Sequence, residues 1–314
     1  FEKMVYHQDD PIADCVCVPL YYVSKLLKDS GVTVVQVGEG SDELFCGYST
    51  YASYLDTYHK YWHPSGKLLP LFMRKTIYKL LSSVYSEDHY KMSMIKSWSE
   101  GKSLFWGGAL AFSEHNKKDI CKIYESETSD MVSKIYPDFS QKFDSYNVVD
   151  YHLKNLNSIK TDNDFLTQMI YLELKQRLPE LLLMRCDKMC MATSVEGRVP
   201  FLDHKLVEFA LKIPKTLKYK NGVTKYILKK VAEKYLPYDV VHRKKMGFAA
   251  PTGRWFYNDS LFGYNFKKTL NYKKETWNKH ININLVETML NKNMDGRGAY
   301  SLQLWVLQNV IGMV

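Results

Sequence analysis

The order of apolar and polar residues near the start of the chain predicts a helix, a strand, a turn and a second helix. Leucine and valine recur at helical spacing between residues 20 and 27, and Gly31 is expected to end that helix. Residues 32–37 (VTVVQV) are β-branched and mostly apolar, which is typical of a strand buried on both faces of a parallel sheet. Residues 38–42 (GEGSD) then form a glycine turn, and Glu43 begins another helical pattern. This order predicts a fragment of a doubly wound α/β domain.

Helical patterns dominate the chain after about residue 58. The longest cover residues 69–84 and 165–183, and loops such as residues 63–66 (HPSG) are expected to separate the helices. The sequence therefore predicts an α/β protein that is predominantly helical, with a partial doubly wound parallel sheet and a large helical portion. Because no repeat or linker interrupts it, one domain is expected over residues 1–314.

Composition and charge narrow the class of protein. Apolar residues make up 46% of the chain and charged residues 25%, which is the balance of a soluble globular protein. No run of about 18 apolar residues could span a bilayer, so no membrane association is expected. The net charge is +9, but the lysines are scattered and no nucleic-acid-binding motif accompanies them, so no nucleic-acid partner is expected.

The 6 cysteines have no spacing that is typical of a metal site or a disulfide framework. In a chain of this length, buried free thiols are the better interpretation. Free thiols favour a reducing, cytoplasmic location.

The glycine turn at residues 38–42 has a composition that suits a phosphate ligand. Its two glycines allow a sharp turn and a close approach of the backbone to a ligand. Glu39 and Asp42 would repel a bare phosphate, but they suit one that carries Mg²⁺, which binds one or two carboxylates together with phosphate oxygens. Alternatively, Ser41 or Asp42 only caps the next helix, and Glu43 interacts with its dipole.

A second group of charged residues lies in an apolar stretch of the last third. Arg185, Asp187 and Lys188 occur among leucines and methionines, and buried charges need partners, so an internal ion-pair network is expected. Glu196 and Arg198 flank a glycine and are expected to line a cleft as a rigid pair. Alternatively, these charges only hold helices together.

The third group is basic. Lysines occur in residues 225–230 and 243–248, and Lys245 precedes Gly247 in a segment that reads as a loop. Such a lysine is a suitable point charge for phosphate. The alternative is a solvated cationic surface, which is the usual role of adjacent lysines.

Taken together, the three stretches resemble the asparagine synthetase family. Residues 38–45 are similar to the GEGSDELF pyrophosphate loop of that family. Residues 187–203 (DKMCMATSVEGRVPFLD) are similar to its DRMSMAHSLEARVPFLD stretch. Residues 225–228 and 243–248 match its KYILR and RxKxGF segments in order and at fitting spacing. The resemblance covers nearly the whole chain.

The resemblance implies a fold and a reaction. The fold would be of the PP-loop type, which is like that of the adenine nucleotide alpha hydrolases. ATP would adenylate a carboxylate with release of pyrophosphate, and ammonia would then attack the acyl-adenylate to give an amide and AMP. The default reaction converts aspartate, with ammonia taken from glutamine, to asparagine. Two alternatives stay open: a different carboxylate acceptor, such as a cell-surface sugar or a peptide, and a non-catalytic remnant that acts as a binding module.

The same resemblance implies roles for individual residues. Glu39 would form or consume the adenylate, with a proton taken from the attacking ammonia as one possible role, and Lys245 would neutralise phosphate charge in the transition state. Asp42 would hold Mg²⁺ on the pyrophosphate. The residues expected to bind ATP and pyrophosphate are Val37, Gly38, Gly40, Ser41, Asp42 and Arg198, with Val37 and Gly38 in contact through their backbone.

The chain departs from the family pattern in several places. Val37 replaces the usual serine, and Cys46 replaces a small residue. The SGGxDS pyrophosphate loop of the family occurs nowhere in the 314 residues, and neither does the glutaminase domain. We expect both to be encoded upstream, so this chain alone is expected to be inactive. The expected partners are small-molecule substrates and a glutaminase domain on the same chain, and a homodimer is left open.

Overall fold

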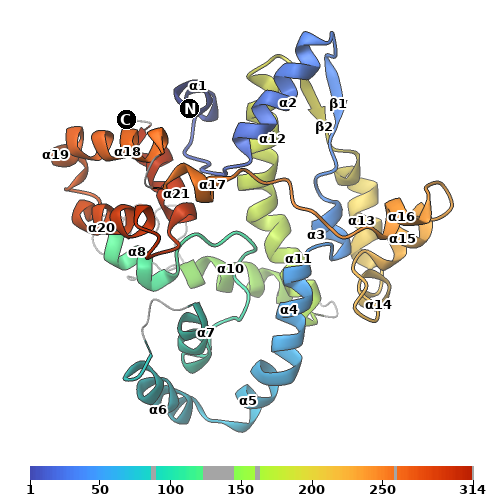
Figure 1. The fold of residues 1–314 in the computed structure, drawn as a ribbon. Coiled ribbons are helices and arrows are strands. Elements are labelled where there is room, and N and C mark those ends of the chain that lie inside the picture. The colour runs from blue at the N-terminus through green and yellow to red at the C-terminus, as the bar shows by residue number, and fades with distance from the viewer. Residues whose placement is uncertain (86–89, 123–144, 160–162, 258–259, 313–314) are drawn as a thin grey trace.

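The computed structural model describes residues 1–85, 90–122, 145–159, 163–257 and 260–312, and they are mostly helical (Figure 1). The elements of the first half are α1 (Glu2–Gln8), α2 (Cys17–Asp29), β1 (Val34–Gln36), α3 (Ser41–Phe45), α4 (Ser49–Thr57), η1 (Tyr58–Trp62), α5 (His63–Leu68), α6 (Leu71–Ser82), α7 (Tyr90–Ser99), α8 (Glu114–Ile120) and α10 (Ser145–Ser158).

The elements of the second half are α11 (Phe165–Lys175), η2 (Leu178–Leu183), α12 (Met184–Met191), β2 (Glu196–Arg198), η3 (Pro200–Leu202), α13 (His204–Lys212), α14 (Lys215–Lys218), α15 (Tyr226–Ala232), α16 (Tyr238–His242), α17 (Thr252–Trp255), α18 (Leu261–Tyr272), α19 (Lys274–Trp277), α20 (Ile283–Met294) and α21 (Ser301–Gly312). The predicted helical character after residue 58 is confirmed. Here η1 and η2 are π-helical segments and η3 is a 3₁₀-helix.

The predicted parallel strand is present, and β2 is its neighbour. β1 and β2 pair in parallel with Val35 opposite Gly197, and the backbone N–H of Val37 extends the pairing by donating to the carbonyl of Arg198 at 2.7 Å. The described residues contain only this two-stranded sheet. A small parallel sheet is therefore confirmed, while the doubly wound arrangement stays a prediction.

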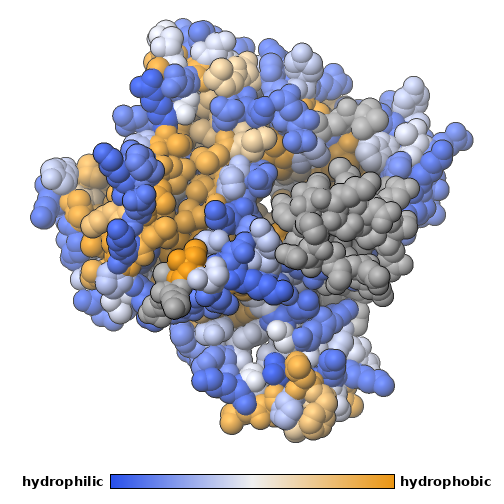
Figure 2. All heavy atoms as spheres, turned by 180° about the vertical axis from the view of Figure 1, so that it is seen from behind, coloured by the Kyte–Doolittle hydropathy of each residue, from blue (hydrophilic) through white to orange (hydrophobic). Residues whose placement is uncertain are grey.

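The expectation that this strand is buried on both faces is wrong for the described residues. Val34 is 41% exposed, and Gln36 is exposed as well. Among the described residues β1 pairs with β2 alone, so this sheet is much smaller than the buried sheet that the pattern suggested. Figure 2 shows hydrophobic residues gathered on the back of the molecule, behind the region where β1, β2 and α12 lie in Figure 1.

The expectation of a loop at residues 63–66 is also wrong, because these residues form the first turn of α5. Pro64 lies in the first turn of that helix, where the missing N–H of proline costs little. The π-helical segment η1 comes directly before it, so the chain continues helically from α4 through α5. Proline and glycine therefore did not end the helix here.

Three clusters of buried apolar side chains hold these elements together. One surrounds Trp305 and joins α18, α20 and α21 to α1 and α2. A second surrounds Met169 on α11 and includes residues of α4 and α10. A small third cluster packs Leu44 and Phe45 of α3 against Ala210 of α13. Because α3 is anchored in this way, the turn before it is held at the carboxyl end of β1.

The cysteines agree with the prediction of free thiols. All 6 cysteines are free thiols, and Cys17, Cys46, Cys186 and Cys190 are buried. In the part of the chain that the structure describes, no helix has the length and apolar character required to cross a bilayer.

Candidate active site

A cavity of about 710 Å³ lies where the turn after β1 meets five distant segments of the chain. Gly38, Glu39 and Asp42 line it from the turn, and Lys245 lines it from the extended segment that follows α16. Four of the residues predicted to bind ATP or to catalyse thus meet in one place, although Asp42 and Lys245 are 203 positions apart.

The other residues of the turn hold its shape. Gly40 has a φ of +90°, and a Cβ at this position would lie 2.3 Å from Leu202 Cδ2, so a larger residue would be strained and crowded. Ser41 is buried, and its hydroxyl accepts a hydrogen bond from Lys225 Nζ at 2.9 Å. Val37, Gly40 and Ser41 do not line the cavity.

Asp42 binds two lysines. Lys225 Nζ lies 2.9 Å from its Oδ1, and Lys245 Nζ donates to its Oδ2 at 2.8 Å. Burial alone would raise the pKa of this carboxyl, but the two lysines together hold its pKa below the ordinary value. Oδ1 is buried and accepts no well-directed hydrogen bond, so its contact with Lys225 is an ion pair only. Gly47 makes this approach possible, since a Cβ there would lie 2.0 Å from Oδ1.

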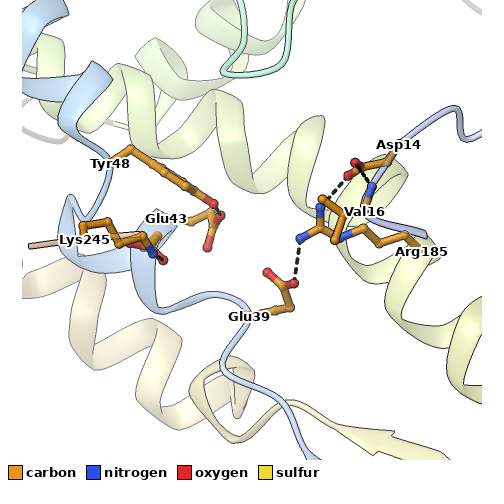
Figure 3. A network of polar contacts seen from close by, with 8 residues as sticks. Asp14, Val16, Glu39, Glu43, Tyr48, Arg185 and Lys245 are labelled. Carbon is orange, nitrogen blue, oxygen red and sulfur yellow. Dashed lines mark hydrogen bonds and ion pairs between the residues drawn. The ribbon is translucent and has the colours of Figure 1, made fainter. Parts of the chain in front are cut away.

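Arg185 connects Glu39 to the start of the chain (Figure 3). It donates from Nη2 to Glu39 Oε1 at 2.9 Å, and from Nη1 to Asp14 Oδ2. The other oxygen of Asp14 accepts from the backbone N–H of Val16 at 2.9 Å. Burial disfavours the charge on Arg185, yet the two carboxylates raise the pKa of its guanidinium. Glu39 is therefore held in a fixed direction by a cation that is itself fixed.

A second polar network lies beside the first. Tyr48 lines the cavity and donates from its hydroxyl to Glu43 Oε1 at 2.5 Å. Burial raises the pKa of the Glu43 carboxyl, although the bond from Tyr48 opposes this. The Arg177 guanidinium stacks on the Tyr48 ring at 4.5 Å and donates from Nη1 to the fully buried Glu173 at 3.0 Å.

Arg198 lies outside this arrangement. Its side chain is 63% exposed and binds Glu196 at 2.9 Å, and neither residue lines the cavity. The backbone carbonyl of Arg198 receives the bond from Val37, so its contribution to the turn is through the main chain. The ion pairs expected around α12 are present for Arg185 and for Lys188, which binds Asp9, while Asp187 is exposed.

The side chains that could bind a metal ion limit the kind of metal site that is possible here. Among the residues that the structure describes, no group of three or more His, Cys, Asp or Glu side chains could hold a metal ion. Asp42 could supply a carboxylate oxygen to a cation that brings its remaining ligands with it, through Oδ2, whose partner Lys245 is 53% exposed. Mg²⁺ on a polyphosphate is such a cation, because it keeps waters and phosphate oxygens and needs few protein ligands.

The model of the asparagine synthase family matches residues 1–313. The chain belongs to this family. It is 34% identical over 258 residues to asparagine synthetase [glutamine-hydrolyzing] 1 of Bacillus subtilis, covering 82% of this chain and 37% of that protein. It is 26% identical over 308 residues to a putative asparagine synthetase of Mycobacterium tuberculosis, covering 97% and 42%. It is also 25% identical over 267 residues to amidase chyE of Penicillium rubens, covering 81% and 38%. No solved structure matches the chain.

Two residues that line the cavity, Arg177 and Tyr48, fall outside the motifs that resemble the asparagine synthase family. Neither they nor Glu173, the buried partner of Arg177, were singled out from the sequence. A signal was present for Glu173 and Arg177, because a Glu–Arg pair at positions i and i+4 lies among leucines, where charges are rarely buried without partners. Lys225 belongs to a segment that resembles the family, but its contacts with Asp42 and Ser41 form only on folding, because Lys225 and Ser41 are 184 positions apart.

Proposed function

We propose that this chain is the ATP-using synthetase part of an enzyme that converts a carboxylate to an amide through an acyl-adenylate. One observation carries the proposal: Glu39, Asp42 and Lys245 converge on a single cavity at the carboxyl end of β1. In open α/β sheets, ligands bind in the crevice at the carboxyl ends of the strands. Membership of the asparagine synthase family supports ATP-dependent amidation as the class of reaction.

In the first step, an oxygen of the acceptor carboxylate attacks the α-phosphorus of ATP, and pyrophosphate leaves. Lys245 is 53% exposed and lies in an extended segment, so it can leave Asp42 and bind a phosphate oxygen without disturbing the core. There it would stabilise the charge that develops in the transition state. The backbone at Val37 and Gly38 would bind the nucleotide, and the space beside Gly38 is open, since a Cβ added there would meet no atom within 4 Å.

Asp42 would hold Mg²⁺ on the pyrophosphate group. The metal would neutralise phosphate charge and favour departure of pyrophosphate. Asp42 supports this role by its lowered pKa, which keeps the carboxylate ionised, and by its Oδ2, whose partner Lys245 is exposed enough to move away. Lys245, which lines the cavity, would then bind the phosphates that the metal brings, while Lys225 would stay paired with Asp42.

In the second step, ammonia attacks the acyl carbon, and AMP leaves. Glu39 lines the cavity and would take a proton from the attacking nitrogen. Arg185 would act as a positioning residue, because it holds one oxygen of Glu39 while Asp14 holds Arg185. The second oxygen of Glu39 makes no hydrogen bond to a described residue, so it stays available to the substrate.

The names of the relatives support a choice of acceptor and of ammonia source. Several relatives are named asparagine synthetases that hydrolyse glutamine, so aspartate and glutamine-derived ammonia are the first choice. Others are named amidases, and an acceptor other than aspartate is the alternative. The chain spans about two-fifths of the length of the curated relatives it matches. A glutaminase domain elsewhere on the full-length protein is part of the proposal.

The test uses the full-length protein with ATP, Mg²⁺, L-aspartate and free ammonia. Aspartate-dependent exchange of labelled pyrophosphate into ATP would report the first step, and formation of asparagine and AMP the second. We expect both with the wild-type protein. ATP cleavage to ADP and phosphate, or exchange that does not depend on any carboxylate, would contradict the proposal.

A further inference from the structure

Another cavity, of about 510 Å³, shares Lys245 with the active-site cavity. Most of its wall comes from α15 and α16, which lie side by side at one edge of the molecule (Figure 1), and from the extended segment after α16. Lys225 lines it as well, and Lys225 and Lys245 are the two lysines that bind Asp42. A ligand in this cavity would therefore contact both cations of Asp42.

The residues of this cavity that carry a permanent charge are all cations, and we call it the basic cavity. They are Lys225, Lys229, Arg243, Lys244 and Lys245. None of its described lining residues is an aspartate or a glutamate. Glu233, at the end of α15, binds Lys230 and His242, and Asp239 of α16 does not line the cavity. Like charges around one cavity raise its positive potential, which favours binding of an anion.

Three of the five cations have no counter-ion in the part of the chain that the structure describes. Two of the five bind Asp42, but the side chains of Lys229, Arg243 and Lys244 form no ion pair or hydrogen bond with a described residue. One carboxylate or one singly charged anion would leave most of this charge unpaired. Linked phosphate groups carry several negative charges, and lysine and arginine are the side chains that bind phosphate.

The basic cavity also has an apolar part. Of its apolar residues, Leu236, Val240 and Met246 are exposed to solvent. The apolar residues that line the cavity are Leu228, Ala232, Leu236, Val240, Val241 and Met246. An apolar wall beside several cations suits a ligand that joins phosphates to a less polar group, as a nucleotide does.

We propose that the basic cavity binds linked phosphate groups, and that this ligand inhibits adenylation because it draws Lys245 away from the active site. Lys245 is 53% exposed and lies in a segment without regular structure, so its ammonium group can serve either cavity. The inhibition rests on the proposed function of Lys245, whereas the binding does not. The phosphates belong to an inorganic polyphosphate or to a nucleotide, and the apolar wall predicts that the nucleotide binds more tightly.

The first experiment measures binding to the full-length protein by calorimetry, with inorganic tripolyphosphate and GTP as the two probes. Mg²⁺ is left out, because it would neutralise the phosphates. The test variant is Lys229→Gln with Lys244→Gln, which removes two unpaired cations of the basic cavity. The matched control is Lys230→Gln with Lys234→Gln, which removes the same charge from residues in and just after α15 that do not line the cavity.

We expect the dissociation constants of both probes to rise about 10- to 100-fold in the test variant, the effect of losing charge-assisted hydrogen bonds. The control should bind as the wild type does. Equal weakening in test variant and control would reduce the effect to net charge and overturn the proposal, as would the absence of binding to the wild type. Tighter binding of GTP than of tripolyphosphate would support the role of the apolar wall, and equal binding would overturn it.

The second experiment adds the same probes to ATP–pyrophosphate exchange. The test variant should exchange at the wild-type rate without a probe, and its half-inhibition should need about 10- to 100-fold more of either probe. Half-inhibition at the wild-type concentration would place the anion in the active site and overturn the proposal.

The two experiments separate failure of this proposal from failure of the proposed function. If the probes bind to the wild type and only weakly to the test variant, but leave exchange unchanged, the site holds and its effect on Lys245 is refuted. If the full-length protein shows no carboxylate-dependent exchange, the proposed function fails, and the calorimetric comparison still decides whether the basic cavity binds linked phosphates.

Discussion

Replacing Lys225 should mainly lower stability, and replacing Lys245 should mainly slow the reaction, although both lysines bind Asp42. Lys225 is 19% exposed, lies 2.9 Å from Asp42 and donates to Ser41. Lys245 is 53% exposed and lies in a segment without regular structure. We therefore expect Lys225 to support the fold and Lys245 to serve the phosphates.

The burial of each lysine sets the size of the effect. Lys225→Ala leaves a buried carboxylate with one cation instead of two, which should lower the free energy of unfolding by about 2 kcal/mol. Lys245→Ala breaks a pair whose lysine is exposed to water, so its cost in stability should be below about 1 kcal/mol. Loss of one transition-state charge contact should nevertheless slow adenylation about 100-fold, which corresponds to about 2.7 kcal/mol.

The assay measures ATP–pyrophosphate exchange beside amide production, with free ammonia supplied so that no glutaminase is needed. Urea unfolding of the same proteins gives the stability of each variant. If Lys245→Ala left both rates near wild type, Lys245 would be a solvated surface lysine and its phosphate role would be wrong. If Lys225→Ala unfolded at the wild-type urea concentration, the ion pair with Asp42 would not stabilise the fold.

Four further outcomes are expected. Asp42→Asn should raise the Mg²⁺ concentration needed for pyrophosphate exchange, since an amide is a poorer ligand for a hard cation, and magnesium titration of the exchange rate checks this. The same variant should be less stable than the wild type only above the acid range. Because the pKa of Asp42 is lowered, its ion pairs stabilise the fold above the ordinary value of 3.8, and this stabilisation is lost as the pH falls through the lowered pKa. The free energies of unfolding of wild type and variant, measured against pH, should therefore converge in acid. Glu39→Gln should lower amide formation while ATP binding, measured by calorimetry, stays near wild type, because Arg185 remains fixed by Asp14. Gly40→Ala should destabilise the protein by about 1–3 kcal/mol in urea unfolding, from its positive φ and the contact with Leu202, and a cost below a few tenths of a kcal/mol would contradict the close packing seen here.

The local elements near the start of the chain could be predicted because short-range patterns specify them. The helical spacing before Gly31 and the β-branched run after it correspond to α2 and β1. The turn at residues 38–42 follows, because glycine at position 40 permits the positive φ that other residues avoid. The same rules failed at residues 63–66, where Pro64 occupies the first turn of a helix rather than a loop.

What the sequence by itself determined is the family, the mostly helical class and four of the residues that line the cavity: Gly38, Glu39, Asp42 and Lys245. Only the tertiary structure decided which charges face one another. It pairs Asp42 with two lysines, and it joins Glu173 and Arg177 to a tyrosine and a glycine loop. It also leaves Arg198 in solvent, although its motif suggested a ligand. The physical reason is that periodicity and turn chemistry act over a few residues, whereas ion pairs between positions far apart form only when packing of the apolar clusters brings them together.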